Sequence, residues 1–173
     1  MRALILCLVL FALNCAHAGP AHVDAHLNQS HLAGQGTFKW FGLKIYDAQL
    51  WVGEKGYRPD APFVLDLVYA RKLHGIRIAE ASVTEMDKLG VGSPAQRAAW
   101  LARMREIFPN VREGMRLSGA HIPGNGVRFY VDGAPLAMGA DPEFARAFFA
   151  IWLDPKTTAP ALRTALLKDA APR

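Results

Sequence analysis

The chain has 173 residues, of which 51% are hydrophobic, and it carries a net charge of +5 at pH 7. Its basic residues are scattered and form no long run, which is typical of a solvated surface and argues against nucleic-acid binding. The two cysteines, Cys7 and Cys15, both lie within the first 18 residues, so the rest of the chain offers no disulfide, thiolate nucleophile or cysteine-ligated metal.

The first 18 residues have the pattern of a secretory signal peptide. A short apolar run from Ala3 to Leu13 precedes the small-x-small sequence AHA, which ends at Ala18. The run is too short to span a membrane. The residue before Cys15 is an asparagine, where a lipoprotein signal has a small residue, so we expect cleavage after Ala18 rather than lipidation. This pattern predicts a periplasmic or secreted protein. The remaining residues, 19–173, have the length of one domain, and we expect them to form a single domain.

Strand periodicity begins at residue 37. Apolar residues alternate with polar ones up to residue 52, which predicts two strand segments that turn at Gly42. A third strand is predicted over 63–71, after a turn region rich in Gly and Pro. Its alternation places Tyr69 and Arg71 on one face with three large apolar residues. Asp66 lies on the other face, which we therefore expect to be the outside.

The remainder of the chain alternates between helical and hairpin patterns. Apolar residues at spacings of three and four, together with capping residues and prolines, predict helices. Two tight turns, PGNG and Asp132-Gly133, predict two consecutive hairpins. The helices are expected over 75–89, 94–108, 142–154 and 160–168, and the hairpins over 114–138. This order of elements predicts an α+β fold, with an antiparallel sheet covered on one face by helices.

The polar segment after the signal contains a pattern that resembles metal ligands. His22, Asp24 and His26 alternate as ligands on a strand do, and His31 follows nearby. A metal site needs ligands that converge and are supported by further contacts, whereas this segment lies at the expected mature N-terminus, where chains are commonly loose. We therefore predict no metal site. The sequence also has no phosphate-binding loop and no nucleophile elbow, and no cofactor is expected.

Arg71 is the sharper candidate for a binding residue. It shares the expected inward face of its strand with Tyr69, and a guanidinium on such a face needs an anionic partner because burying an unpaired charge is costly. The anion is either an internal carboxylate, for example Glu80 or Glu85, or the carboxylate of a ligand held by two hydrogen bonds. The sequence leaves both interpretations open. An apolar slot with one Arg and one or two Tyr at its mouth suits a fatty or aromatic acid.

Four segments resemble one known family. They are GLKIYDAQLW (42–51), LVYARKLHGIRIAEASVTEM (67–86), GVRFYVDG (126–133) and FARAFFAIWLDPKTTAPALRTALL (144–167). As a set they resemble the bacterial secreted branch of the chalcone isomerase-like family, over nearly all of the chain after the signal. The resemblance implies an open-faced β-sandwich, in which an antiparallel sheet is covered by helices and a ligand cleft lies between the two layers.

The same resemblance implies two kinds of function. Plant enzymes of the family close a chalcone in an intramolecular lyase reaction, and other members bind fatty acids without catalysis, holding the carboxylate with an Arg and a Tyr. Phe38 stands where the plant enzymes have a catalytic Arg, and Tyr46 stands where they have a Thr that positions water. The helical segment that carries their catalytic Tyr and Asn is shortened, and the Ser or Thr of their pocket helix falls near Ala145 or Arg146. Cyclisation needs a cation or fixed donors near the developing enolate, and Phe38 supplies neither.

The first hypothesis is therefore a periplasmic, cofactor-free protein that binds a fatty acid or another small hydrophobic carboxylate in the cleft without catalysis. Tyr46 and Arg71 are the expected polar anchors. The expected apolar wall consists of Phe38, Trp40, Tyr69 and Phe148. Two alternatives remain: an isomerase of the intramolecular lyase type, with Tyr46 and Arg71 as its catalytic groups, and an envelope interaction module. Neither nucleic-acid binding nor stable membrane insertion after signal removal is expected, and the sequence does not indicate an oligomeric state.

Overall fold

The structure is a computed structural model that describes residues 19–139 and 141–172. The predicted signal peptide, with Cys7 and Cys15, lies outside the described residues. Among the residues that are described, no helix combines the length and the apolar character needed to cross a bilayer.

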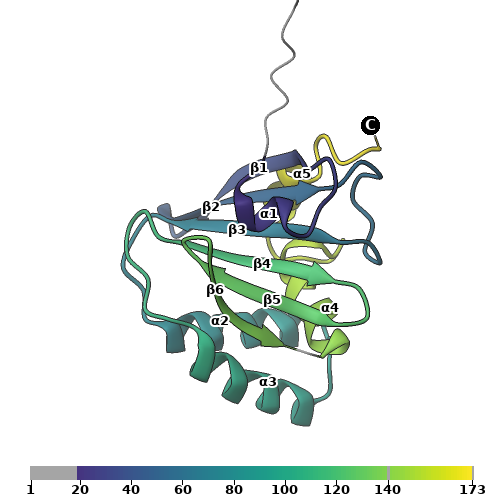
Figure 1. Ribbon diagram of the computed structural model, residues 1–173. Helices are drawn as coiled ribbons and strands as arrows, with labels where there is room; N and C mark the ends of the chain where they lie inside the picture. Colours follow the sequence, from purple (N-terminus) through teal and green to yellow (C-terminus); the bar gives the residue numbers. More distant parts are fainter. Residues whose placement is uncertain (1–18, 140, 173) are drawn as a thin grey trace, which may run out of the picture.

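Six antiparallel strands form one sheet, and each strand pairs with its neighbours in the chain, in the order β1-β2-β3-β4-β5-β6 (Figure 1). The strands are β1 (His31–Trp40), β2 (Leu43–Val52), β3 (Phe63–Tyr69), β4 (Arg116–Ile122), β5 (Gly126–Val131) and β6 (Ala134–Gly139). Between β3 and β4 the chain forms two helices, α2 (Gly75–Lys88) and α3 (Pro94–Ile107). The two-residue connections between β1 and β2 and between β5 and β6 require antiparallel pairing there, because so short a turn cannot join parallel strands.

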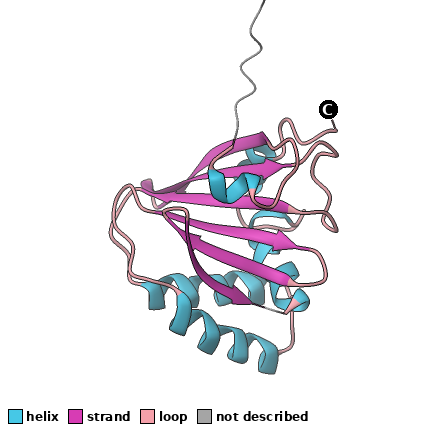
Figure 2. Ribbon diagram, viewed as in Figure 1, coloured by secondary structure: helices cyan, strands magenta, loops and turns pink. Residues whose placement is uncertain are grey.

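Four helices lie over one face of the sheet (Figures 1 and 2). Besides α2 and α3 they are α4 (Pro142–Leu153), which packs against β5 and α2, and α5 (Pro160–Leu166), which packs against β1 and β2. A further short helix, α1 (Ala21–Asp24), lies on the opposite face. The predicted α+β architecture, an open antiparallel sheet with helices on one face, is confirmed, and α1 is the addition to it.

Capping residues begin two of the helices where the sequence predicts. At the start of α3, the Gln96 backbone N–H donates to Ser93 Oγ at 3.2 Å, and the Ser93 N–H donates to Gln96 Oε1 at 2.8 Å. At the start of α4, Asp141 Oδ1 accepts from the backbone N–H groups of Glu143 and Phe144 at 2.9 and 3.0 Å. These bonds satisfy donors that the first turn of a helix leaves without a partner.

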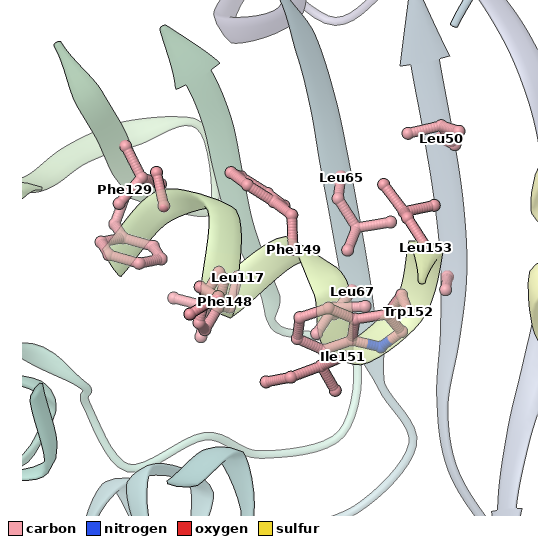
Figure 3. Packing of buried hydrophobic residues seen from close by; sticks show 14 of the residues in the cluster. Leu50, Leu65, Leu67, Leu117, Phe129, Phe148, Phe149, Ile151, Trp152 and Leu153 are labelled. Carbon is pink, nitrogen blue, oxygen red and sulfur yellow. The ribbon is translucent and has the colours of Figure 1, made fainter. Parts of the chain in front are cut away.

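The core lies between α4 and the middle of the sheet. Figure 3 shows side chains of α4 over residues of β3, β4 and β5. Phe148 meets Phe129 of β5 edge to face. Phe149 meets Phe63 of β3 in the same way. Aromatic pairs of this geometry add to the free energy of burying the rings. The apolar stripe predicted for α4 is thus its core-facing side.

β1 begins at His31 rather than at residue 37, where the sequence pattern first indicates a strand. Its first six residues include two glycines that α5 approaches closely. A Cβ on Gly34 would lie 2.1 Å from the backbone oxygen of Ala165, and one on Gly36 would lie 2.8 Å from a side-chain carbon of Leu162. Only glycine allows the helix to pack this closely on the strand. The glycines therefore serve helix packing, and because they bear no side chains they conceal the strand alternation.

The prediction that Asp66 faces solvent is wrong. Asp66 is fully buried, and its two oxygens bind His22 Nε2 at 2.9 Å and Arg116 Nη1 at 3.0 Å. The side chain does lie on the face of β3 opposite to Leu65 and Leu67, as the alternation predicts. The segment around α1 covers that face, however, and Val23 and Leu27 form a small core with Val64, Ala120 and Tyr130 there.

Candidate binding cavity

A cavity of about 350 Å³ lies between the sheet and the helices. Its lining comes from the adjacent ends of β1, β2 and β3, from α2 and α4, and from the segment before α5. The volume falls within the range of about 300–1,000 Å³ that is usual for small-molecule sites. Apolar side chains make up most of the wall, and they include Phe38, Trp40, Ile45, Leu67, Leu73, Ile78, Phe108, Leu117, Phe148, Ile151 and Trp152.

Aromatic rings from three strands line the sheet side of the cavity. Phe38 stacks on Tyr46 with ring centroids 5.1 Å apart, and Tyr46 meets Tyr69 edge to face at 5.8 Å. These contacts follow from strand register, because Phe38 pairs with Tyr46 across β1 and β2, and Tyr46 pairs with Tyr69 across β2 and β3. Directly paired residues point to the same face of a sheet. The three rings therefore form one continuous wall.

Trp152 of α4 fixes the Tyr46 ring from the helix side. Its indole N–H donates a hydrogen bond of 3.0 Å to the hydroxyl oxygen of Tyr46. Burial raises the pKa of Tyr46 far above its usual value, and the Trp152 hydrogen bond only partly offsets this. The hydroxyl is therefore uncharged, and because it accepts from Trp152 its own proton remains available for an acceptor in the cavity.

The Tyr69 hydroxyl is the other phenol in the wall. The Tyr69 side chain is only 3% exposed, and burial strongly raises its pKa, so the hydroxyl remains protonated. Within the described part of the chain, no hydrogen-bond partner exists for this hydroxyl. The hydroxyl oxygen is not one of the fully buried unpaired atoms of the described residues, so it keeps access to the cavity. An uncharged donor without a protein acceptor, in the wall of an apolar cavity, fits a ligand that carries a hydrogen-bond acceptor.

Charged groups in the lining lie on α2. Glu85 accepts hydrogen bonds from Lys88 Nζ, at 2.7 Å, and from the hydroxyl of Thr158. Arg77 binds Glu80 at 3.0 Å, and its side chain is 77% exposed. The charges therefore border the cavity where it meets solvent, while the aromatic wall supplies uncharged donors.

Comparison with known proteins identifies the family. A match to the chalcone isomerase-like family covers residues 18–168, which is most of the chain. The chain belongs to the chalcone isomerase-like family. No curated protein gives a significant sequence match. Among solved structures, a fatty-acid binding protein of Arabidopsis thaliana has the same fold, with a TM-score of 0.62 at 12% sequence identity, over 82% of this chain and 88% of the plant protein.

Five of the six residues that the sequence predicts to bind a ligand line the cavity. They are Phe38, Trp40, Tyr46, Tyr69 and Phe148. Tyr46 pairs directly with Tyr69, so both side chains lie on the helix-covered face. The sequence alone indicated this face only for Tyr69, through the alternation in β3. Their contact with a ligand stays a prediction.

Arg71 is the sixth residue, and it is not among those that line the cavity. β3 ends at Tyr69, whose N–H donates to Met115 O at 2.9 Å and whose carbonyl accepts from Gly114 N–H at 2.8 Å. Beyond this point the chain leaves the sheet, so the alternation that placed Arg71 inward no longer applies. Glu80, one of the two carboxylates suggested as its partner, binds Arg77 and Arg105 instead.

The alternating histidines also have partners other than a metal. His22 binds Asp66, and His26 Nε2 lies 2.6 Å from the hydroxyl of Tyr130. Among the residues described, no group of three His, Cys, Asp or Glu side chains is arranged to hold a metal ion. The segment is helical in α1 rather than extended, so the spacing of these side chains differs from that on a strand.

Sequence reasoning did not find Trp152 as a polar contact or Tyr69 as a donor. Trp152 is buried on the core-facing side of α4, and Tyr69 was expected to belong to the apolar wall. The available signal was chemical: buried Trp and Tyr usually find partners for their N–H and O–H groups. Which partners they find depends on how α4 crosses the sheet, and local sequence does not encode this.

Proposed function

We propose that this chalcone isomerase-like protein is a periplasmic, non-catalytic binder of a fatty acid or another hydrophobic carboxylate. The observation that carries the proposal is the apolar cavity with an uncharged Tyr69 hydroxyl that has no partner in the described chain. The shared fold with a fatty-acid binding protein of Arabidopsis thaliana supports it. The signal-peptide pattern of residues 1–18 supports export of a bacterial secreted branch member.

In the proposed complex, the hydrocarbon chain packs on the rings of Phe38, Phe148 and Trp152. Each Å² of apolar surface removed from water contributes about 25 cal/mol. The ligand carboxylate accepts from the hydroxyls of Tyr46 and Tyr69, since both keep their protons at neutral pH. Trp152 donates to the Tyr46 oxygen, and this polarises the Tyr46 O–H bond toward a further acceptor.

The aromatic wall favours binding over isomerisation. Closing a chalcone generates negative charge on an enolate oxygen, and a cation or several fixed donors would have to stabilise that charge. Phe38 occupies the place that the family resemblance gives to a catalytic Arg, and the cations in the lining, Arg77 and Lys88, are both paired with carboxylates. We therefore propose a binding role. Incubation with chalcones, followed by ultraviolet absorbance, checks it: a turnover above the buffer rate would support the isomerase alternative.

The first experiment is to identify what the protein carries. The full chain is expressed in bacteria, the processed protein is purified from the periplasmic fraction, and the denatured sample is extracted for mass spectrometry. We expect fatty acids in stoichiometric amount and an N-terminus at Gly19. A protein retained in the cytoplasm with residues 1–18 attached would contradict the proposed location.

The second experiment tests the anchor. Tyr69→Phe removes a hydroxyl that binds no described protein atom, so the fold should keep its stability. A hydrogen bond to a charged group contributes about 1.5–3 kcal/mol, so the affinity for oleic acid, measured by calorimetry on delipidated protein, should fall about tenfold or more. Tyr57→Phe is the matched control, because Tyr57 packs against Phe63 outside the cavity lining. Equal oleate affinity in both variants would remove the hydroxyl from the proposed site.

A further inference from the structure

The β1–β2 hairpin presents large apolar side chains to solvent at its tip, which we define as Trp40–Leu43. Trp40 and Leu43 face each other across the hairpin, and each is 55% exposed. Phe41, in the turn between them, is 88% exposed. A folded protein rarely presents adjacent exposed aromatic residues unless they contact another surface.

The backbone at Phe41 adds to this. Phe41 has φ 46° and Gly42 has φ 79°, which is the two-residue turn that favours Asn-Gly. A bulky residue at positive φ is strained, and such strain persists where function requires the side chain. Among the described residues, the Phe41 ring has one ring partner, Trp40, at 4.9 Å. Packing therefore offers little compensation for placing a phenylalanine where asparagine would be more stable.

Positive charge surrounds the same tip. Lys39 and Lys44 are paired directly across the hairpin, an arrangement in which like charges repel. Lys44 binds Asp47 at 2.6 Å, whereas Lys39 has no carboxylate partner among the residues described. The loop after β3 is tied to the start of β2 by a bond from Ala70 N–H to Ile45 O, and it adds Arg71 and Lys72, for which the described chain likewise supplies no carboxylate.

We propose that this end of the molecule docks on a bilayer that contains anionic phospholipids, with the hairpin tip in the headgroup region. Aromatic side chains favour that depth of the bilayer, and each nearby Lys or Arg contributes about 1 kcal/mol toward an anionic surface. An anionic surface also relieves the repulsion between Lys39 and Lys44. The partner is a lipid surface because the exposed group combines aromatic rings with cations that lack carboxylates.

Trp40 links the tip to the cavity, because it is exposed on the tip and also lines the cavity. Docking therefore brings the edge of the cavity to the membrane, so that a lipid-derived ligand passes between bilayer and protein without crossing water. This last step rests on the proposed function, whereas docking itself does not.

The test compares vesicle binding with folding stability. The full chain is expressed, and the protein without its signal peptide is sedimented with vesicles. The vesicles contain phosphatidylcholine alone or phosphatidylcholine and phosphatidylglycerol in equal amounts. We expect binding to the anionic vesicles that weakens with salt. Phe41→Asn should reduce this binding about tenfold, because it removes the inserted ring, while urea unfolding shows equal or greater stability. Lys39→Glu should reduce it about fivefold or more and should also preserve stability, since the introduced carboxylate would face Lys44 across the hairpin.

Met138→Asn is the control for exposed apolar surface, because Met138 is 40% exposed on β6, at the far edge of the sheet from β1. Equal binding of all variants, no binding of the wild type, or equal binding to both kinds of vesicle would overturn the docking proposal. So would concentration-dependent dimerisation in sedimentation that Phe41→Asn abolishes, since the tip would then bind a second copy. Oleate affinity without vesicles is measured in parallel, and because Phe41 does not line the cavity it should not change. If the wild type binds anionic vesicles but does not bind oleate, the proposed function is contradicted and the docking proposal stands.

Discussion

β3 contributes alternate residues to the two faces of the sheet, and the polar groups on those faces have different surroundings. On the face under α1, both oxygens of Asp66 are bonded, to His22 and Arg116, and Ser118 Oγ lies 3.2 Å from His22 Nε2. On the face under α2 and α4, Tyr69 has a hydroxyl with no partner in the described chain. A saturated network stabilises a structure, and an unsaturated donor in a cavity leaves a bond for a ligand to complete.

The largest expected effect comes from breaking the buried Asp66 network. Asp66→Ala leaves His22 buried without its acceptor and Arg116 without its carboxylate. Removing one partner of a buried ion pair costs about 3–5 kcal/mol, and since Arg116 keeps some solvent access we expect about 3 kcal/mol less free energy of unfolding in urea. Asp47→Ala is the control on the neighbouring strand, where the ion pair with Lys44 is exposed, and it should cost less than about 0.5 kcal/mol. If both variants lose a similar free energy of unfolding, the buried network stabilises the fold no more than the exposed ion pair does.

A smaller effect is expected on acidification, and it involves one histidine on each face. Burial, with the positive charge of Arg128, lowers the pKa of His26 below its usual 6.5. Burial also lowers the pKa of His121, although the hydrogen bond that His121 Nδ1 donates to Ala61 O opposes this. With folded-state pKa values below those of the unfolded chain, the unfolded chain binds more protons as pH falls below about 6.5. Stability is therefore complete above that pH and declines as pH falls through the folded-state values.

Single variants assign this pH dependence to a face. We expect urea midpoints between pH 7 and 5 to change less with pH in His26→Gln and in His121→Gln than in the wild type. If only His26→Gln flattens the profile, the face under α1 controls acid stability. A profile that neither substitution alters would contradict the assignment to these histidines.

The smallest effect is expected at Arg71, which lies beyond the end of β3 and does not line the cavity. Arg71→Ala should change oleate affinity less than twofold and the free energy of unfolding by less than about 0.5 kcal/mol, as is usual for surface positions. Calorimetry and urea unfolding measure both. A loss of oleate binding comparable with that in Tyr69→Phe would restore Arg71 as an anchor.

Local patterns predicted the parts of the fold that are decided locally. The Ser93 capping box, the hairpin turns and the inward face of β3 follow from neighbouring residues. The position of Tyr46 on the cavity side follows only from its pairing with Tyr69 in the structure. The failures at Asp66 and Arg71 have a different origin. Covering of a sheet face by a short helix, and the residue at which a strand ends, depend on tertiary contacts that periodicity does not report.

The close packing of α5 on β1 has a consequence for when the fold can form. Gly34 lies against the backbone of Ala165, and Asp169 N–H donates to Ala33 O at 2.7 Å, so contacts between residues more than a hundred positions apart hold this edge strand. During synthesis, β1 therefore lacks its covering helix until the segment around residue 165 has been made. For a chain that we propose to be exported, this delay keeps the edge strand incomplete while the polypeptide is still being translocated.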